Sequence, residues 1–234
     1  MKLVVLQSNF LPWRGYFDLI NRADKFVLYD CVQYTKNDWR NRNKILSKNG
    51  VQWITLEAIK PYSKCSINEV LVTKKSLSKA VTSLEISYRN ARTYSILDRV
   101  IIKPVRDFIE SDKISLSNLN EVLIRSVASH LDIKTEIISS KDIDSAKLML
   151  IENKTKRLIS LLSQLNATSY LTGPSATSYL YGQVHLFQQA KIKLDIMCYP
   201  EYSHYKQFSY QFIDNLSIAD FLAHSGDKKN LVFA

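Results

Sequence analysis

The densest group of polar, charged and aromatic side chains lies in residues 30–43, which read DCVQYTKNDWRNRN. Arginine offers fork-shaped donors that match phosphate or carboxylate groups, and tryptophan and tyrosine offer flat faces for a base or sugar ring. The stretch therefore predicts a binding segment for a polar, anionic ligand. Its candidate binding residues are Gln33, Tyr34, Lys36, Trp39, Arg40, Asn41, Arg42 and Asn43, with Asp30 as a candidate proton acceptor. The alternative is a surface loop that Trp39 anchors and whose arginines pair with nearby acids.

A second candidate segment is residues 7–17, which follow the apolar run at the start of the chain. Gln7 and Asn9 stand where a predicted buried strand runs into a turn, and an amide side chain there can both donate to and accept from a ligand. Trp13 and Tyr16 add ring faces. Gly15 permits close backbone approach at a helix start, where free N–H groups favour anions. Many first turns share these features, so this segment alone is weak evidence.

Two later segments also contain residues suited to binding or catalysis. Gly173-Pro174-Ser175 follows a predicted strand and precedes a helix, so Gly173 and Ser175 either contact a phosphate or form only a capping turn. In residues 199–207, His204 is the best candidate for a general base because histidine titrates near neutral pH. Tyr205 and Gln207 are its candidate binding neighbours. A structural or exposed histidine is the alternative.

The elements that would position these residues alternate between strand and helix patterns. Strands are expected at 2–6, 25–29, 135–139, 170–172 and 194–197, with a helix at 15–23 between the first two. Such alternation predicts an α/β fold with a Rossmann-like, mostly parallel sheet flanked by helices. Ligands of such sheets bind beyond the carboxyl ends of the strands. The segments after 2–6 and after 25–29 should therefore meet in one cleft.

The remaining patterns predict a hairpin and a helical middle third. Lys48-Asn49-Gly50 separates two apolar runs and is typical of a tight hairpin turn. Helices are expected at 76–93, 95–110 and 118–131, the last opened by Ser117, and two more at about 145–165 and 175–190. We expect a single domain over 1–234, with a helical sub-lobe at about 76–132.

Composition narrows the classes of protein that the chain can be. With 46% hydrophobic residues, the chain of 234 residues can build a sizeable core. It contains no apolar run of about 20 residues and no signal-peptide pattern, which predicts a cytoplasmic protein without a membrane span. Three widely spaced cysteines favour reduced thiols over a disulfide framework, and no metal-binding motif occurs. The net charge of +10 favours anionic partners, but the charges are dispersed as on an ordinary solvated surface.

The segments described above resemble the WbqC-like family. The runs QSNFLPWRGYFDLI and DCVQYTKNDWRNRNKI are similar to its opening signature, and further matches follow at residues 170–180, 205–207 and 216–226. Two departures stand out: Ser8 replaces an expected proline, and Cys31 replaces an expected second acid after Asp30. If paired carboxylates were the catalytic device, Cys31 would put it in doubt. The resemblance implies a role in surface-polysaccharide and O-antigen biosynthesis.

The resemblance implies a transferase that acts on a nucleotide-linked amino sugar, with acyl or aminoacyl transfer to the sugar amine, and the residues suited to polar, anionic ligands agree with such a substrate. A nucleotide-linked sugar is the expected partner. No cofactor is firmly implied beyond an acyl or aminoacyl donor, no metal is expected, and a homo-oligomer is compatible with the sequence. Two alternatives stay open. A single-stranded nucleic-acid-binding module would explain the basic and aromatic residues at 34–43, although nucleic acid is the less favoured partner. A non-catalytic partner in a biosynthetic assembly is the other.

Overall fold

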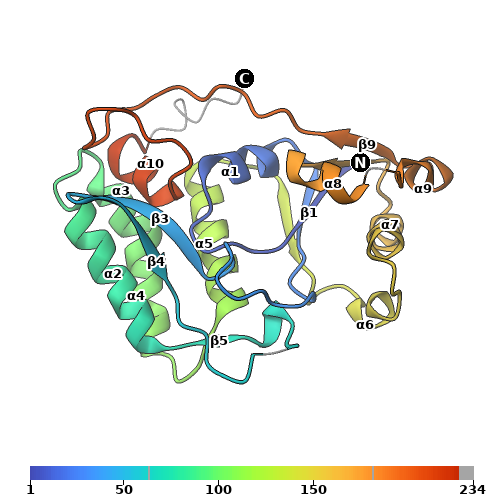
Figure 1. Ribbon diagram of the computed structural model, residues 1–234, viewed down its shortest axis with the longest axis horizontal. Helices are drawn as coiled ribbons and strands as arrows, with labels where there is room; N and C mark the ends of the chain where they lie inside the picture. Colours follow the sequence, from blue (N-terminus) through green and yellow to red (C-terminus); the bar gives the residue numbers. More distant parts are fainter. Residues whose placement is uncertain (63, 181, 227–234) are drawn as a thin grey trace.

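A five-stranded parallel sheet forms the centre of the protein (Figure 1). The computed structural model describes residues 1–62, 64–180 and 182–226. The strands are β1 (Lys2–Leu6), β2 (Lys25–Leu28), β7 (Glu136–Ser139), β8 (Ser169–Thr172) and β9 (Lys193–Ile196), in the order β7-β2-β1-β8-β9. All four pairings between neighbours are parallel. This confirms the predicted α/β fold with a Rossmann-like sheet flanked by helices.

The direction in which the chain adds strands reverses between β1 and β8. β1 pairs with β2 on one side, and the chain returns to add β8 and β9 on the other. β1 and β2 pair along four residues, from Leu3 to Leu6, whereas β1 and β8 pair only at Lys2 and Leu3. β1 and β8 therefore diverge toward their carboxyl ends. Open α/β sheets bind ligands at such a switch point.

The central strands contribute alternate side chains to two hydrophobic cores, because successive residues of a strand point to opposite faces. Val4, Phe26 and Leu28 face the core that includes α1 (Arg14–Asn21) and α5 (Leu116–His130). Leu3, Val5 and Val27 face the core that includes α7 (Lys154–Gln164) and α9 (Val184–Gln189). The sheet is thus covered by helices on both faces.

The chain between β2 and β7 extends the first of these cores. It forms the hairpin β3 (Arg42–Ser47) and β4 (Gly50–Thr55), the short pair β5 (Leu71–Val72) and β6 (Ile114–Ser115), and the 3₁₀ turn η1 (Ile67–Glu69). Its helices are α2 (Lys74–Tyr88), α3 (Tyr94–Leu97), α4 (Lys103–Glu110) and α5, with a π-helical turn at Asp98–Ile102. Buried Leu77, Leu84 and Ile101 belong to the same core as the sheet residues. The predicted hairpin is confirmed, with Gly50 at φ +96° in its turn.

Two predicted long helices are wrong, because each is divided. The stretch 145–165 forms α6 (Ser145–Met149) and α7, since the Asn153 side chain accepts a hydrogen bond from the Lys156 N–H and starts a new helix there. The stretch 175–190 forms η3 (Pro174–Ala176), α8 (Thr177–Leu180) and α9. Gly182, at φ +85°, lies between α8 and α9 in a conformation that no helix continues through.

After β9 the chain crosses the top of the molecule as an extended strap, residues 197–217, before α10 (Ile218–His224) (Figure 1). The strap passes over α1, and Arg14 at the start of α1 donates a hydrogen bond to the Ser203 carbonyl at 2.7 Å. Tyr202 donates to the buried Asp18 carboxylate of α1 at 2.7 Å. Among the described residues, the structure contains no helix with both the length and the hydropathy of a membrane-crossing segment.

Candidate functional site

Asp30 connects three elements at the carboxyl edge of the sheet. Its side chain is 1% exposed. One oxygen accepts a 2.8 Å hydrogen bond from the Ser8 N–H after β1, and the other accepts a 2.7 Å hydrogen bond from the Ser117 hydroxyl on α5. A carboxylate that is buried and already bonded at both oxygens is poorly placed to take a proton from a substrate. The geometry therefore supports a positioning role for Asp30 in place of the expected catalytic one.

The sequence predicted that Ser117 caps the helix at 118–131. In the structure Ser117 does not cap α5, so its hydroxyl is available to Asp30. The Ser115 side chain caps the helix by accepting from the Asn118 N–H. The predicted start at Ser117 is therefore wrong by two residues. Ser117 is the second residue of α5, and its hydroxyl donates to the carboxylate of Asp30, two residues beyond β2.

The ends of β2 and β7 are joined through Ser140. Its hydroxyl oxygen accepts from the backbone N–H groups of Asp30 and Cys31 at 3.1 and 3.2 Å. Cys31 is buried, and this burial raises the pKa of its thiol. A neutral thiol thus occupies the position where the family pattern led us to expect a second acid. A catalytic pair of carboxylates at positions 30 and 31 does not exist in this chain.

The turn after β1 and the loop after β2 lie against each other. Arg40 donates a hydrogen bond to the side-chain oxygen of Asn9, and the Phe10 N–H donates to the Trp39 carbonyl at 2.9 Å. Arg40 also lies 3.7 Å from the Asp38 carboxylate, and its side chain is 15% exposed. The structure therefore brings together the two segments with the strongest sequence signals, and each terminal nitrogen of the Arg40 guanidinium already has a neighbour in the protein.

Asp38 stays ionised beside Arg40. Burial opposes its ionisation, but hydrogen bonds from the Thr35 hydroxyl and the Trp39 N–H, together with the charge of Arg40, hold the pKa of Asp38 below its usual value. This carboxylate orders the loop between β2 and β3 and restrains the Arg40 side chain.

Asn120 of α5 supports the same region, although no sequence motif points to it. Its side-chain nitrogen donates to the Arg40 carbonyl at 2.9 Å and to the Ser8 hydroxyl at 3.2 Å. Asn120 is fully buried, and its side-chain oxygen has no hydrogen-bond partner among the described residues. The only sequence signal was an amide on the apolar face of a predicted helix.

Several expected binding residues instead stabilise the protein from within. Asn41 donates to the Leu56 carbonyl at 2.8 Å, and Asn43 donates to the Phe10 and Leu11 carbonyls at 3.1 and 2.7 Å. Both asparagines are buried. Asn43 thereby holds the turn in which Leu11 adopts φ +46°. Direct ligand contact by Asn41 and Asn43 is therefore not supported.

Tyr16 and Tyr34 are also buried. The Tyr16 hydroxyl donates to the Gln7 carbonyl at 3.0 Å, and burial raises its pKa well above the usual value. Burial likewise raises the pKa of Tyr34 to about 12, and its ring packs edge-on against Tyr62 with centroids 5.8 Å apart. These rings are therefore not free to stack on a ligand.

Within residues 30–43, the exposed members of the predicted site are Gln33, Lys36 and Trp39. The Lys36 ammonium lies 5.9 Å from the centre of the Tyr62 ring. Trp39 is 42% exposed and packs against Trp53 of β4 with ring centroids 5.4 Å apart. Arg42 lies over the Trp53 ring at 4.4 Å. These side chains remain available to a ligand.

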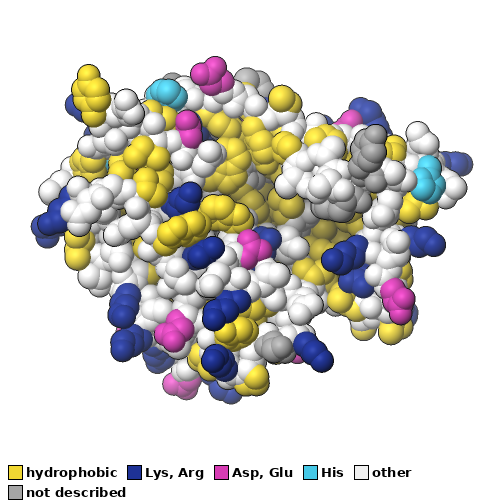
Figure 2. Space-filling model, in the orientation of Figure 1, with side chains coloured by type: hydrophobic (Ala, Val, Ile, Leu, Met, Phe, Trp, Pro, Cys, Tyr) yellow, Lys and Arg dark blue, Asp and Glu magenta, His cyan; other side chains and the backbone are white. Residues whose placement is uncertain are grey.

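At the switch point, Gly173 follows β8 and Trp13 precedes α1. A Cβ at Gly173 would lie 3.2 Å from the Tyr199 hydroxyl, so glycine allows the strap to approach the end of β8 closely. Tyr199 in turn packs edge-on against Trp13 with centroids 5.0 Å apart. Ser175 is exposed in η3 and its carbonyl accepts from Ser178. Figure 2 shows hydrophobic side chains gathered in the hollow between α1 and α8, with Lys and Arg side chains below it.

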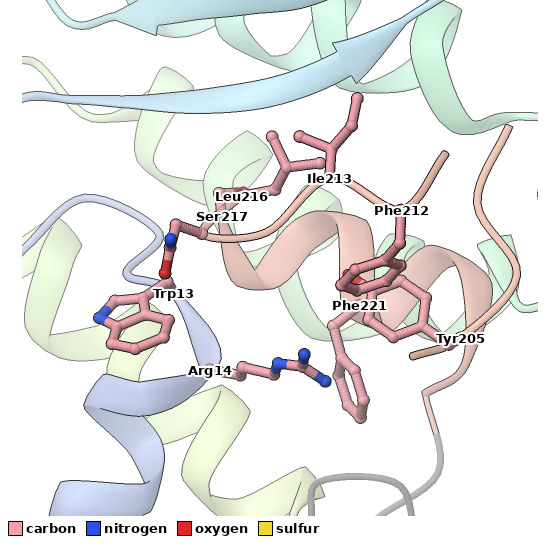
Figure 3. A pocket seen from close by; sticks show the side chains of 9 residues that line it. Trp13, Arg14, Tyr205, Phe212, Ile213, Leu216, Ser217 and Phe221 are labelled. Carbon is pink, nitrogen blue, oxygen red and sulfur yellow. The ribbon is translucent and has the colours of Figure 1, made fainter. Parts of the chain in front are cut away.

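Tyr205 and Gln207 hold the strap in place. Both donate to the same oxygen of the buried Asp220 carboxylate, at 2.7 and 2.8 Å. Burial and the neighbouring Asp220 charge raise the pKa of Tyr205. The cavity beside Tyr205 and Arg14 has a volume of about 10 Å³, which suits one water molecule rather than a substrate (Figure 3). These two expected binding residues are therefore structural.

His204 is exposed on the strap and stacks on Phe212 with ring centroids 4.1 Å apart. It lines an open groove of about 640 Å³ formed by residues 204–210 and Phe212. No contact between His204 and the Asn9–Arg40 region is observed among the described residues. Within those residues there is also no group of three or more His, Cys, Asp or Glu side chains placed to hold a metal ion.

Comparison with known proteins agrees with the resemblance of the motifs. The sequence model of the WbqC-like protein family matches residues 7–231. An uncharacterized protein of Mycobacterium tuberculosis, Rv1507c, is 39% identical over 228 residues, which cover 96% of this chain and 94% of that protein. No solved structure matches the chain.

Proposed function

The chain belongs to the WbqC-like protein family, and from that premise we propose that it is a transferase acting on a nucleotide-linked amino sugar in surface-polysaccharide biosynthesis. The sugar would bind at the carboxyl edge of the sheet, beside the point where β1 and β8 part. Gln7 and Asn9 after β1, and Arg40 after β2, would hold its hydroxyl and phosphate groups.

The observation that carries this proposal is the contact between Asn9 and Arg40. It unites an amide, which can donate and accept, with a guanidinium that favours phosphate. Both side chains are supported from behind by buried polar groups, because Asp30 and Asn120 bond the backbone or hydroxyl of Ser8 and the carbonyl of Arg40. A polar pair held in this way is preorganised for a ligand.

The reaction we propose is acyl or aminoacyl transfer to the sugar amine. The amine lone pair attacks the carbonyl carbon of an activated acyl donor, a new C–N bond forms, and the bond between that carbon and the donor's leaving group breaks. The amine gives up one proton. That proton passes to solvent water, since both Asp30 oxygens already accept hydrogen bonds and His204 makes no contact with Asn9 or Arg40 among the described residues.

A thermal-shift screen against UDP-, dTDP- and GDP-linked amino sugars, with and without acyl or aminoacyl donors, tests this function. A true ligand raises the melting temperature because it binds only the folded protein. Titration calorimetry should then show that Arg40→Ala loses about 1–3 kcal/mol of binding free energy. Arg125→Ala is the matched control, because Arg125 pairs with Glu121 on the surface of α5. Absence of any shift with every nucleotide sugar would reject the proposal.

A single-stranded nucleic-acid-binding module remains the second candidate. It is favoured by exposed Trp39 and Trp53 beside Arg42, because aromatic faces and cations together bind unpaired bases. Binding of an oligonucleotide with a steep dependence on salt would support it. No mobility shift at low salt, about 50 mM, would exclude it.

A further inference from the structure

The outer face of the β3–β4 hairpin carries an aromatic platform edged by cations. Trp39 and Trp53 are 42% and 44% exposed, and their rings lie 5.4 Å apart at 38°. The Arg42 guanidinium lies 4.4 Å from the centre of the Trp53 ring, and the Lys44 ammonium lies 5.2 Å from it. Trp39, Trp53, Arg42 and Lys44 together form this platform.

Strand pairing explains why these side chains meet. Lys44 is directly opposite Trp53 in the antiparallel register, and Arg42 is opposite Thr55, one step along the same face. Opposed residues of such a pair project to the same side of the sheet. The other side of the hairpin carries Asn43, Ile45 and Ile54, which are buried. The platform is therefore the solvent face of a hairpin whose inner face is anchored in the core.

The charges of Arg42 and Lys44 are not neutralised by ion pairs within the described part of the chain. Among the described residues, no ion pair includes Arg42 or Lys44, and the Nε–H of Arg42 has no hydrogen-bond partner although it is buried. Arg40, by contrast, contacts Asp38 and Asn9. The Nε–H itself is out of reach of solvent, but a guanidinium without an ion-pair partner, next to an exposed ring, is suited to an anionic group attached to a flat one.

Resting on the proposed function, we infer that this platform binds the nucleoside diphosphate part of the sugar donor. The base stacks on the exposed face of Trp53, and Arg42 and Lys44 beside that ring neutralise the diphosphate. The attached sugar then extends toward Asn9 and Arg40, because the Trp39 carbonyl is bonded to the Phe10 N–H next to Asn9. Trp53 and Lys44 thereby become binding residues that the sequence motifs did not single out.

Tryptophan fluorescence tests this inference with two probes, a nucleoside and the corresponding nucleoside diphosphate. Uridine, thymidine and guanosine and their diphosphates are each titrated into the full chain. The diphosphate with the matching base should quench the fluorescence. Trp53→Ala should weaken both nucleoside and diphosphate binding by about tenfold, the loss expected for one base stack. Lys44→Ala should weaken diphosphate binding and leave nucleoside binding unchanged. Val51→Ala, on the same exposed face of β4, should change neither.

The outcomes separate this inference from the proposed function. If nucleotide sugars bind the wild type and Trp53→Ala binds them equally well, the platform assignment is overturned while the transferase proposal stands. If neither nucleotide sugars nor nucleoside diphosphates bind the wild type, both fail. If only a single-stranded oligonucleotide binds and Trp53→Ala abolishes that binding, the platform serves nucleic acid and the inference is overturned. Trp53→Phe, which keeps a ring, should retain most of the affinity and excludes misfolding as the cause of a loss.

Discussion

The carboxylate of Asp30 accepts a 2.8 Å hydrogen bond from the backbone nitrogen of Ser8, twenty-two residues away. This contact joins the ends of β1 and β2. The Ser117 hydroxyl of α5 donates to the other oxygen of the same carboxylate. The polar groups at the carboxyl edge of the sheet are thus ordered by a buried carboxyl side chain. This support also positions the half-buried side chains of Arg40 and Asn9 at the same edge.

Replacing Asp30 by asparagine should destabilise the protein by about 1.5–3 kcal/mol, the value of hydrogen bonds to a charged group. The amide also turns one N–H group toward a donor, either the Ser8 N–H or the Ser117 hydroxyl. Urea unfolding measures the loss. Asp112→Asn, at an exposed position, is the control. A variant of unchanged stability that lost turnover would instead restore Asp30 as a catalytic residue.

Tyr205→Phe should loosen the strap, because Asp220 keeps only the donor from Gln207 on that oxygen. We expect a loss of about 1.5–3 kcal/mol in unfolding free energy. Limited proteolysis should cut the strap sooner in this variant. Tyr210→Phe removes a hydroxyl from a fully exposed residue of the strap and should behave like the wild type. Equal stabilities for the two variants would show that the Asp220 contact does not hold the strap.

Gly15→Ala should strain the start of α1. A Cβ at this position would lie 2.3 Å from the Trp13 ring, so either the ring or the helix must move. Overpacking of this kind costs about 1–3 kcal/mol. The Trp13→Ala variant removes the obstacle, so the double variant should be more stable than the sum of the two single changes predicts, by at least about 0.5 kcal/mol. Strict additivity would contradict the clash.

The contribution of Asp38 should depend on pH. Its pKa in the folded protein is held below the ordinary value of 3.8. Stability from the ionised carboxylate is therefore fully present above pH 3.8, and is lost as the pH falls through the lower folded-state value. Asp38→Asn should be less stable than the wild type at pH 7, and the difference should vanish in strong acid. Urea midpoints measured from pH 7 to pH 2 check this, and a difference that grew on acidification would refute it.

Local patterns were sufficient to predict the framework of the sheet. Strand 2–6 matches β1, and strands at 25–29, 135–139, 170–172 and 194–197 match the other four within a residue or two. The spacing of apolar residues and the residues of a turn involve only near neighbours in the chain, so both can be recognised in the sequence. The prediction of one long helix at 145–165 was wrong because it relied on the same kind of spacing alone. The spacing of apolar residues continues through Asn153 and so predicts one helix. The hydrogen bond by which the Asn153 side chain starts a new helix leaves no trace in that spacing.

The sequence by itself determined which residue types follow each strand, and therefore that amides, arginines and aromatics gather at one edge of a parallel sheet. Only the tertiary structure decided which of them face solvent. Asn41 and Asn43 turn inward to backbone carbonyls, whereas Trp39 turns outward to meet Trp53. Asn120 reaches Arg40 across eighty residues. Such partners depend on how α5 and the hairpin pack against the sheet, and packing is a property of distant segments that no local pattern contains.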